Sequence, residues 1–265
     1  MMNVSICSYR PLLESCAVEG FEFQLDPYVG CEHRCHYCYA LNQAETDWAK
    51  EIKIHQDIGD QLNKELDSIP SQTIYLGWKA DPYLPSEGSY RQTRQVLQIL
   101  SERGFSACVL TKSDLVVRDM DILRNMKNAS VGISVAFNDE NTRGLFEANT
   151  LDLGPRIQGL SKLREAGIKT YALICPVFPH ITNVELLIDM LASHTDEIWI
   201  YGLSMEEHSD LNWQNTDVIL SRHFPKLKKR IEAAAFSAQH PYWVELRQKL
   251  EKLGEERQLD LKICL

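Results

Sequence analysis

Short apolar runs, many rich in β-branched residues, alternate with helical patterns through most of the chain, and this alternation constrains the fold more than any other feature. The runs that we interpret as strands are residues 21–25, 73–78, 106–111, 130–137, 170–177 and 197–203. Strands separated by helices are typical of repeated strand–helix units around a parallel sheet. Six such units predict an α/β fold of the TIM type, a partial (β/α)6 barrel.

Helical patterns fill the gaps between these runs, and several of them end at glycine, a common stop signal. They cover residues 54–68, 88–104, 118–127, 155–167 and 183–194. After residue 203 the pattern becomes helix-rich and more basic, and it closes with a possible edge strand at 259–265. The sequence therefore predicts a barrel over residues 1–203 and a helical C-terminal extension over residues 204–265, packed on the barrel.

Composition narrows the class of protein and its partners. The chain has 265 residues, 44% of them hydrophobic, and a net charge of -9, which argues against extensive coating of nucleic acid. Its start lacks a basic segment followed by a long apolar run, and no uncharged apolar stretch of about 18 residues occurs. We therefore expect a cytoplasmic protein with no membrane partner.

Three of the eight cysteines crowd into one short stretch, "GCEHRCHYCYA", directly after the first predicted strand. Cys31, Cys35 and Cys38 are separated by three and by two residues. Loops at the carboxyl ends of the strands carry the chemistry of TIM-type barrels. Three thiolates on a tight loop suit a [4Fe–4S] cluster and leave one iron open to a substrate or cofactor.

Other classes of site and protein remain as alternatives. A zinc ion could take the three cysteines together with His33 or His36, although ligands so close in sequence are cramped and no second Cys-x-x-Cys completes the usual arrangement. An iron–sulfur electron-transfer protein would use the cluster without further chemistry. A nucleic-acid-binding module with a structural metal would need a basic stripe with interleaved aromatic residues, which the barrel region lacks.

The cysteine stretch resembles the signature of radical S-adenosylmethionine (radical SAM) enzymes, with Tyr37 as the aromatic residue before the third cysteine. From about residue 26 to 181 the chain is similar to the spore photoproduct lyase family. The segments that carry this similarity are "KADPYLPSE", "RQTRQVLQIL", "LTKSDLVVRDMDIL", "LFEANT" and "AGIKTYALICPVFP".

The resemblance implies a [4Fe–4S] cluster whose open iron is chelated by S-adenosylmethionine, and one-electron cleavage of that cofactor to a 5'-deoxyadenosyl radical. It implies that Tyr37 lies beside the adenine and that Asp81, Lys112 and Ser134 contact the ribose or methionine part. Glu147, Arg156 and Arg94 also match family motifs, and a scaffold of salt bridges explains them equally well.

One departure bears on the reaction. The spore photoproduct lyases have a cysteine at the end of the second strand, and this chain has Trp78 there. Tyr37 and Tyr39 match two tyrosines that these lyases use in hydrogen transfer. Cys175 ends the fifth predicted strand and is a candidate hydrogen donor, although a free cysteine such as Cys175 or Cys108 is often a small core residue.

The resemblance leaves the substrate open between a modified nucleobase, a peptide and a small metabolite. It also implies an electron donor such as flavodoxin or ferredoxin. Because Trp78 has no thiol, we expect an enzyme that abstracts hydrogen from an unidentified substrate, with DNA photolesion repair as the alternative.

Overall fold

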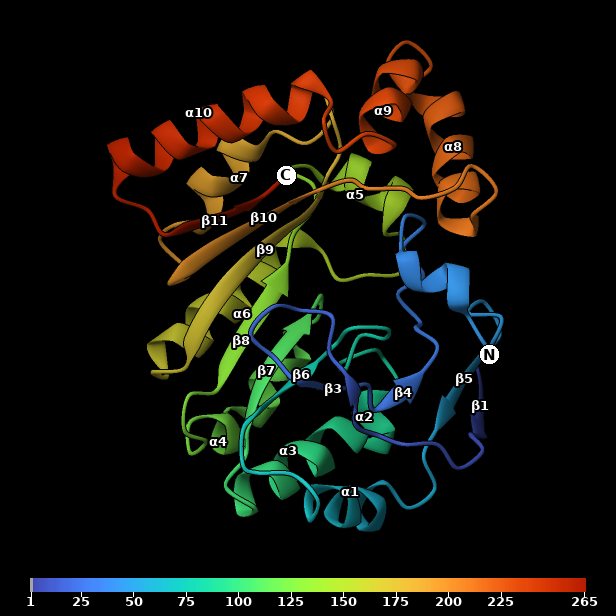
Figure 1. Cartoon of the computed structure of the whole chain (residues 1–265), viewed down its shortest axis with the longest axis vertical. Coiled ribbons are helices and arrows are strands. Elements are labelled where there is room, and N and C mark those ends of the chain that lie inside the picture. The colour runs from blue at the N-terminus through green and yellow to red at the C-terminus, as the bar shows by residue number, and fades with distance from the viewer. Residues whose placement is uncertain (1) are drawn as a thin grey trace.

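The computed structural model describes residues 2–265 and is built on one large, mostly parallel sheet (Figure 1). Its strands run in the order β11-β10-β9-β8-β7-β6-β3-β2, and every neighbouring pair is parallel except β2 with β3. The strands are β2 (Glu14–Ser15), β3 (Phe23–Leu25), β6 (Thr73–Leu76), β7 (Ser106–Thr111), β8 (Ser130–Ser134), β9 (Lys169–Val177), β10 (Glu197–Gly202) and β11 (Leu261–Cys264). All six predicted strands and the closing edge strand are confirmed.

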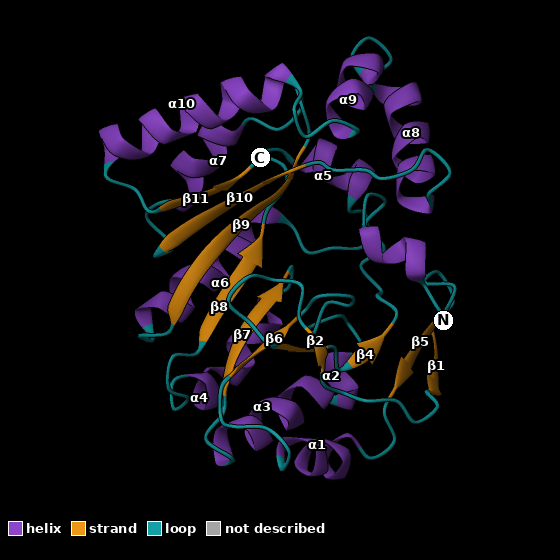
Figure 2. Cartoon of the chain, in the orientation of Figure 1, coloured by secondary structure: helices purple, strands orange, loops and turns teal. Residues whose placement is uncertain are grey.

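Helices follow most of these strands and cover one side of the sheet (Figure 2). They are α1 (Ile58–Leu66), α2 (Glu87–Tyr90), α3 (Gln92–Glu102), the 3-10 helix η2 (Asp114–Asp119), α4 (Met120–Leu123), α5 (Glu140–Phe146), α6 (Leu153–Glu165) and α7 (Val184–Leu191). The prediction of one continuous helix over 88–104 was wrong, because Arg91 adopts a left-handed conformation with φ of 54° and separates α2 from α3.

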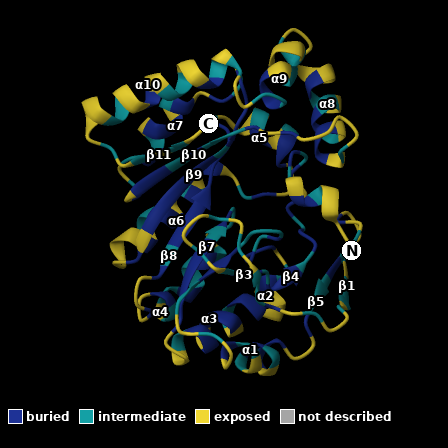
Figure 3. Cartoon of the chain, in the orientation of Figure 1, coloured by how far each residue is buried: buried dark blue, intermediate teal, exposed yellow. Residues whose placement is uncertain are grey.

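The two faces of the main sheet have different neighbours, and β9 shows this residue by residue. Ala172 and Ile174 belong to the large core beneath the helices, whereas Tyr171, Leu173 and Cys175 face the opposite, inner side. Such alternation follows from the two-residue period of a strand. Figure 3 shows how the buried strands form the centre of the molecule while exposed residues concentrate on the helices and loops.

A second, three-stranded sheet lies beside the barrel in the order β1-β5-β4. Its strands are β1 (Asn3–Ile6), β5 (Glu51–Ile54) and β4 (Tyr28–Val29). The last residue of β5, Ile54, is the first residue of the helical pattern predicted over 54–68, and the helix itself begins only at Ile58. This sheet backs the segment that leads into the cysteine loop, because β4 ends two residues before Cys31.

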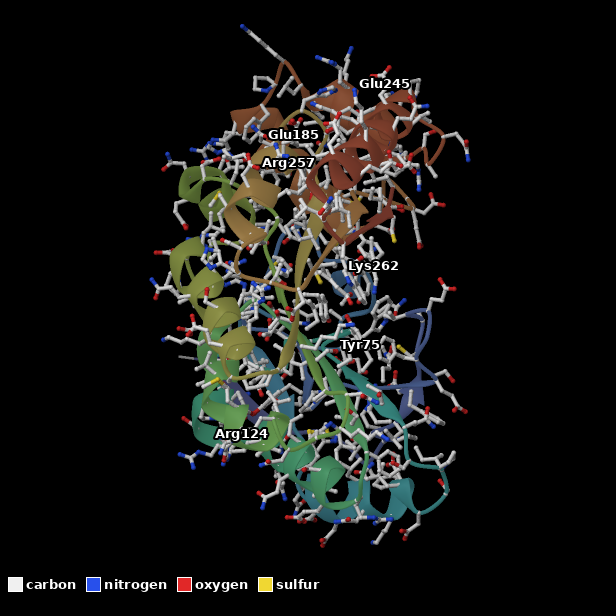
Figure 4. The ribbon with its side chains drawn as sticks, turned by 90° about the vertical axis from the view of Figure 1, so that its left-hand side faces the viewer. Tyr75, Arg124, Glu185, Glu245, Arg257 and Lys262 are labelled. Carbon is white, nitrogen blue, oxygen red and sulfur yellow. The ribbon has the colours of Figure 1, made fainter. Side chains whose placement is uncertain are left out.

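The C-terminal part contains α8 (Leu211–His223), α9 (Lys228–Ala235) and α10 (Pro241–Arg257) before the chain returns to the main sheet as β11. Ion pairs Lys249–Glu185 and Arg257–Asp189 join α10 to α7; Glu185 and Arg257 are labelled in Figure 4. The boundary at residue 203 stays a prediction. Among residues 2–265, no helix combines the length and the apolar character that crossing a membrane requires.

Candidate active site

The cysteine loop leaves β4 through Gly30, whose φ of +86° and close surroundings admit no side chain. A Cβ there would lie 2.6 Å from Oγ1 of Thr46. In the loop that follows, Cys31 and Cys35 are buried, Cys38 is half-buried, and none of the three forms a disulfide. The Cys38 N–H donates to the Cys35 carbonyl oxygen at 3.1 Å, so the second and third thiols lie on one tight turn.

The three thiols lie close enough to affect one another electrostatically. Burial raises the pKa of Cys31 to about 12 and raises the pKa values of Cys35 and Cys38 as well. Charge on Cys31 or Cys38 raises the pKa of Cys35 further, whereas the Lys112 ammonium lowers it. Buried thiols of this kind become thiolates when a metal supplies positive charge, so the donor set fits an iron–sulfur cluster.

The zinc alternative receives no support from the geometry. Within residues 2–265, no three His, Cys, Asp or Glu side chains converge closely enough to hold a single metal ion. The cysteines of a cubane bind different irons, so they need not meet at one point.

Asp81 connects the cysteine loop to the end of β7. It follows Gly77, where β6 ends earlier than predicted. Gly77 has a φ of +104°, and a Cβ at this residue would lie 2.2 Å from the Leu110 carbonyl oxygen. The carboxylate accepts hydrogen bonds from the Thr111 hydroxyl at 2.6 Å and from the Lys112 N–H at 2.7 Å. Nδ1 of His33 lies 3.2 Å away but outside hydrogen-bond geometry.

These contacts determine the charge of Asp81. Burial alone would raise its pKa, but the His33 imidazole, the Thr111 hydroxyl and the Lys112 N–H outweigh burial and hold the pKa at about 2. Asp81 is therefore ionised, and its contacts connect the cysteine loop to the end of β7. Sequence reasoning considered His33 only as a possible zinc ligand. Its position beside Asp81 was not predicted, because only the folded chain brings the two residues together.

Lys112 and Ser134 meet at the carboxyl ends of β7 and β8. Nζ of Lys112 donates to Oγ of Ser134 at 2.9 Å and lies 5.9 Å from the ring centroid of Tyr37. It also lies 3.9 Å from Oε1 of Glu147. Burial by itself lowers the pKa of Lys112, but Glu147 and Cys35 outweigh it and raise the pKa, so the ammonium stays charged beside the thiols.

Glu147 is the centre of a fully buried polar network. Arg156 donates to it at 2.8 Å, with both side chains inaccessible to solvent, and the Tyr37 hydroxyl donates to its other oxygen. Arg156 also donates to the carbonyl oxygens of Ser134, at 2.9 Å, and Leu151, at 2.8 Å. The network therefore fixes the cysteine loop, through Tyr37, to the end of β8.

We expect Arg156→Met to lower the free energy of unfolding by about 3–5 kcal/mol, because it leaves Glu147 buried without its main counter-ion. Arg164→Met is the matched control, since Arg164 pairs with Asp196 at the surface, where an ion pair contributes about 1 kcal/mol or less. Urea unfolding of the two variants measures the difference. Equal losses would show that the buried pair contributes no more than a surface pair.

The two candidates for hydrogen transfer lie on the inner side of the sheet. Cys175 is half-buried there, and burial raises its pKa to about 11, so it carries its hydrogen at neutral pH. The Tyr39 ring lies 5.1 Å from that of Trp78, and its hydroxyl donates to the Trp78 carbonyl oxygen. Their catalytic roles stay predictions.

Two other residues raised by the sequence lie away from this group. Cys108 is 2% exposed within the inner aromatic cluster. Arg94 forms ion pairs with Asp119 at 2.7 Å and Asp121 at 2.8 Å, which agrees with the scaffold interpretation.

The inner face of the sheet also carries a wall of aromatic residues that sequence patterns did not reveal. Tyr171 and Trp199 stack at 4.5 Å, and Nζ of Lys262 lies 4.5 Å from the Trp199 ring. Tyr75 lies on the same face, and Figure 4 labels it below Lys262. The strand period could have indicated these positions once the inner face was known.

Two kinds of solved structure resemble this fold. A spore photoproduct lyase variant with bound S-adenosylmethionine and dinucleoside spore photoproduct superposes with a TM-score of 0.60 at 18% identity, covering 84% of this chain and 66% of that one. SuiB of Streptococcus suis bound to the precursor peptide SuiA has a TM-score of 0.58 at 13% identity, and the match covers 90% of this chain and 48% of that one. These likenesses support the partial barrel.

Sequence relatives come from archaea, bacteria and phage. An uncharacterised protein of Methanocaldococcus jannaschii is 31% identical over 194 residues, which cover 71% of this chain and 73% of the relative. An uncharacterised protein of Mycobacterium tuberculosis is 26% identical over 208 residues, which cover 72% of this chain and 61% of the relative. A radical SAM Nalpha-GlyT isomerase of Pseudomonas phage M6 is 25% identical over 162 residues, covering 60% and 34%.

The family model described as the radical SAM superfamily matches residues 25–191, more than half of the chain. The match contains the three cysteines of the loop together with Asp81, Lys112, Ser134 and Glu147. The chain therefore belongs to the radical SAM superfamily and is a radical SAM enzyme.

Proposed function

We propose that Cys31, Cys35 and Cys38 hold a [4Fe–4S] cluster and that the enzyme abstracts hydrogen from an organic substrate on the inner side of its sheet. The observation that carries this proposal is the position of the Lys112 ammonium, which lies 5.9 Å from the ring of Tyr37 in the cysteine loop while it binds Ser134 at the neighbouring strand end. A cluster with bound S-adenosylmethionine supplies a 5'-deoxyadenosyl radical, and the protein supplies binding and orientation.

The residues around the loop have distinct tasks in this proposal. Lys112 offers a charged donor to the carboxylate of the methionine part, and Ser134 offers a hydroxyl to the ribose. Asp81 holds the cysteine loop to β7 and is within reach of the same cofactor. Tyr37 places its ring beside Lys112 and is fixed by Glu147, so its orientation toward the adenine is set in advance.

Reduction with dithionite tests the function directly. The reconstituted protein should convert S-adenosylmethionine to methionine and 5'-deoxyadenosine. Protein that carries its full iron content, binds the cofactor and forms no 5'-deoxyadenosine would contradict the proposed function.

We expect Lys112→Ala to weaken the binding of S-adenosylmethionine by about 10- to 100-fold, because a hydrogen bond to a charged group contributes about 1.5–3 kcal/mol. Lys64→Ala, on the exposed surface of α1, is the control. Calorimetric titration of both variants, at matched iron content, measures the effect. Unchanged affinity would remove Lys112 from the cofactor site.

Cys175 is proposed as the donor that returns hydrogen to a product radical, since it faces the inner side of the sheet with its thiol protonated. Tyr39, beside Trp78 and directly after Cys38, is the second candidate. The partners remain proposals: a modified nucleobase, a peptide or a small metabolite as substrate, and flavodoxin or ferredoxin as electron donor. Free thiols and an iron–sulfur cluster suit the reducing conditions of a cytoplasm.

A further inference from the structure

A cavity of about 280 Å³ lies beside the cysteine loop, between the N-terminal segment and the inner face of β3. Gln24 and Asp26 enter its wall from β3 and the turn after it, on the side opposite Leu25, which belongs to the core beneath the helices. The 3-10 helix η1 (Tyr39–Gln43), which begins directly after Cys38, and Trp78 form another part of the wall. Its volume suits a small molecule or one side chain.

Two polar groups in this wall have no hydrogen-bond partner in the part of the chain that the structure describes. They are Oε1 of Gln24, a residue 2% exposed, and Nε1 of Trp48, a residue 6% exposed. Buried polar groups are almost always paired, and an unpaired one costs stability. A ligand with one donor for Gln24 and one acceptor for Trp48 would satisfy both.

The charges of the wall favour a cation. Lys79 pairs with Glu14, and Arg10 pairs with Glu45 at 2.6 Å, so both positive side chains are already neutralised. Asp26 accepts backbone N–H groups of Lys79, at 3.0 Å, and Ala80, at 3.2 Å, and has no ion-pair partner among residues 2–265. Burial raises the pKa of Asp26 to about 6, although the N–H groups of Ala80 and Lys79 lower it.

Aromatic rings complete the wall. Tyr39, Trp48 and Trp78 line the cavity, and the rings of Tyr39 and Trp78 lie 5.1 Å apart. An organic cation is attracted to the faces of such rings. A phosphate would instead meet three carboxylates, those of Glu14, Asp26 and Glu45, against two neutralised cations.

We propose that this cavity binds the primary ammonium group of the substrate, with Asp26 and Gln24 accepting its hydrogen bonds and Trp48 donating to a hydroxyl or carbonyl oxygen nearby on the same molecule. The substrate class is thus an amine that also carries oxygen. The inference rests on the proposed function, since Tyr39, next to Cys38, joins the cavity to the cysteine loop.

Matched probes test the site without turnover. Phenylalaninol carries both an ammonium and a hydroxyl group, and 3-phenylpropan-1-ol lacks only the ammonium. Calorimetric titration of anaerobically reconstituted protein should show at least tenfold tighter binding of phenylalaninol, because its ammonium makes charge-assisted bonds. Equal binding of the two alcohols, or no binding of either, would overturn the proposal.

Two conservative variants locate the binding within the cavity. Trp48→Phe removes one N–H and Gln24→Met removes one amide, and neither breaks a hydrogen bond within the protein that the structure shows. Each should weaken phenylalaninol binding by about tenfold, the effect of one hydrogen bond, while the control Asp47→Asn, an exposed carboxylate outside the cavity wall, should leave it unchanged. Unchanged binding in both cavity variants would contradict the assignment.

Measuring 5'-deoxyadenosine on the same samples separates this inference from the proposed function. Cofactor cleavage without ammonium-dependent binding would contradict the cavity alone. Ammonium-dependent binding without any cleavage would contradict the proposed function and leave the cavity supported.

Discussion

We expect replacement of Cys31, Cys35 or Cys38 by alanine to abolish iron–sulfur content in the reconstituted protein. The wild type should bind about four irons and four sulfides, because thiolate ligation of a cubane assigns one protein sulfur to each of three irons. The three thiols occupy one short loop, and no other cysteine shares it. Loss of any one therefore removes a ligand that the loop cannot replace.

Analysis of iron and acid-labile sulfide measures this effect. Cys264→Ala is the control, because Cys264 is exposed at the far edge of the sheet and lies outside the loop. A wild-type protein that bound one zinc ion tightly and took up no iron under reducing, oxygen-free conditions would disprove the cluster assignment.

The second large effect that we expect is an absence of repair: the reduced enzyme should cleave S-adenosylmethionine but should not efficiently repair spore photoproduct. A thymine radical left after bond cleavage needs a weakly bound hydrogen close by. The spore photoproduct lyases supply it from a cysteine at the end of the second strand, and Trp78 occupies this place here, against Tyr39 and Tyr75. An indole cannot return the hydrogen atom as a thiol does, and Cys175 belongs to a different strand.

Chromatography after incubation with dinucleotide spore photoproduct measures the outcome, with a spore photoproduct lyase as the positive control. Trp78→Ala should change substrate handling and leave iron content as in the wild type, because Trp78 lines the cavity and is not a ligand. Catalytic formation of the two thymidines by the wild type would return the enzyme to the repair class.

The barrel strands could be predicted because burial on both faces demands continuous apolar runs, which the sequence displays directly. The strands of the small sheet are only two to four residues long, too short for a periodic pattern. The left-handed Arg91 also leaves no signal, since a residue that favours helices occupies a conformation imposed by the fold.

In the candidate site, too, some features could be predicted from the sequence and others could not. The thiols lie within one loop, so their spacing alone indicated a cluster. The pairing of His33 with Asp81 joins positions 48 residues apart in the chain, and the unpaired Gln24 and Trp48 meet in a cavity only after folding. Sequence patterns do not indicate contacts between residues that lie so far apart in the chain.

The alternation along β9 gives this protein a way to acquire new substrates. Ala172 and Ile174 contribute to the packing that keeps the barrel folded, whereas their neighbours Leu173 and Cys175 face the reaction side. Mutations at every second residue can therefore reshape the inner wall while the buried layer stays intact. Substitutions on the inner side of β9 can thus change substrate specificity, while the residues that keep the barrel folded stay the same.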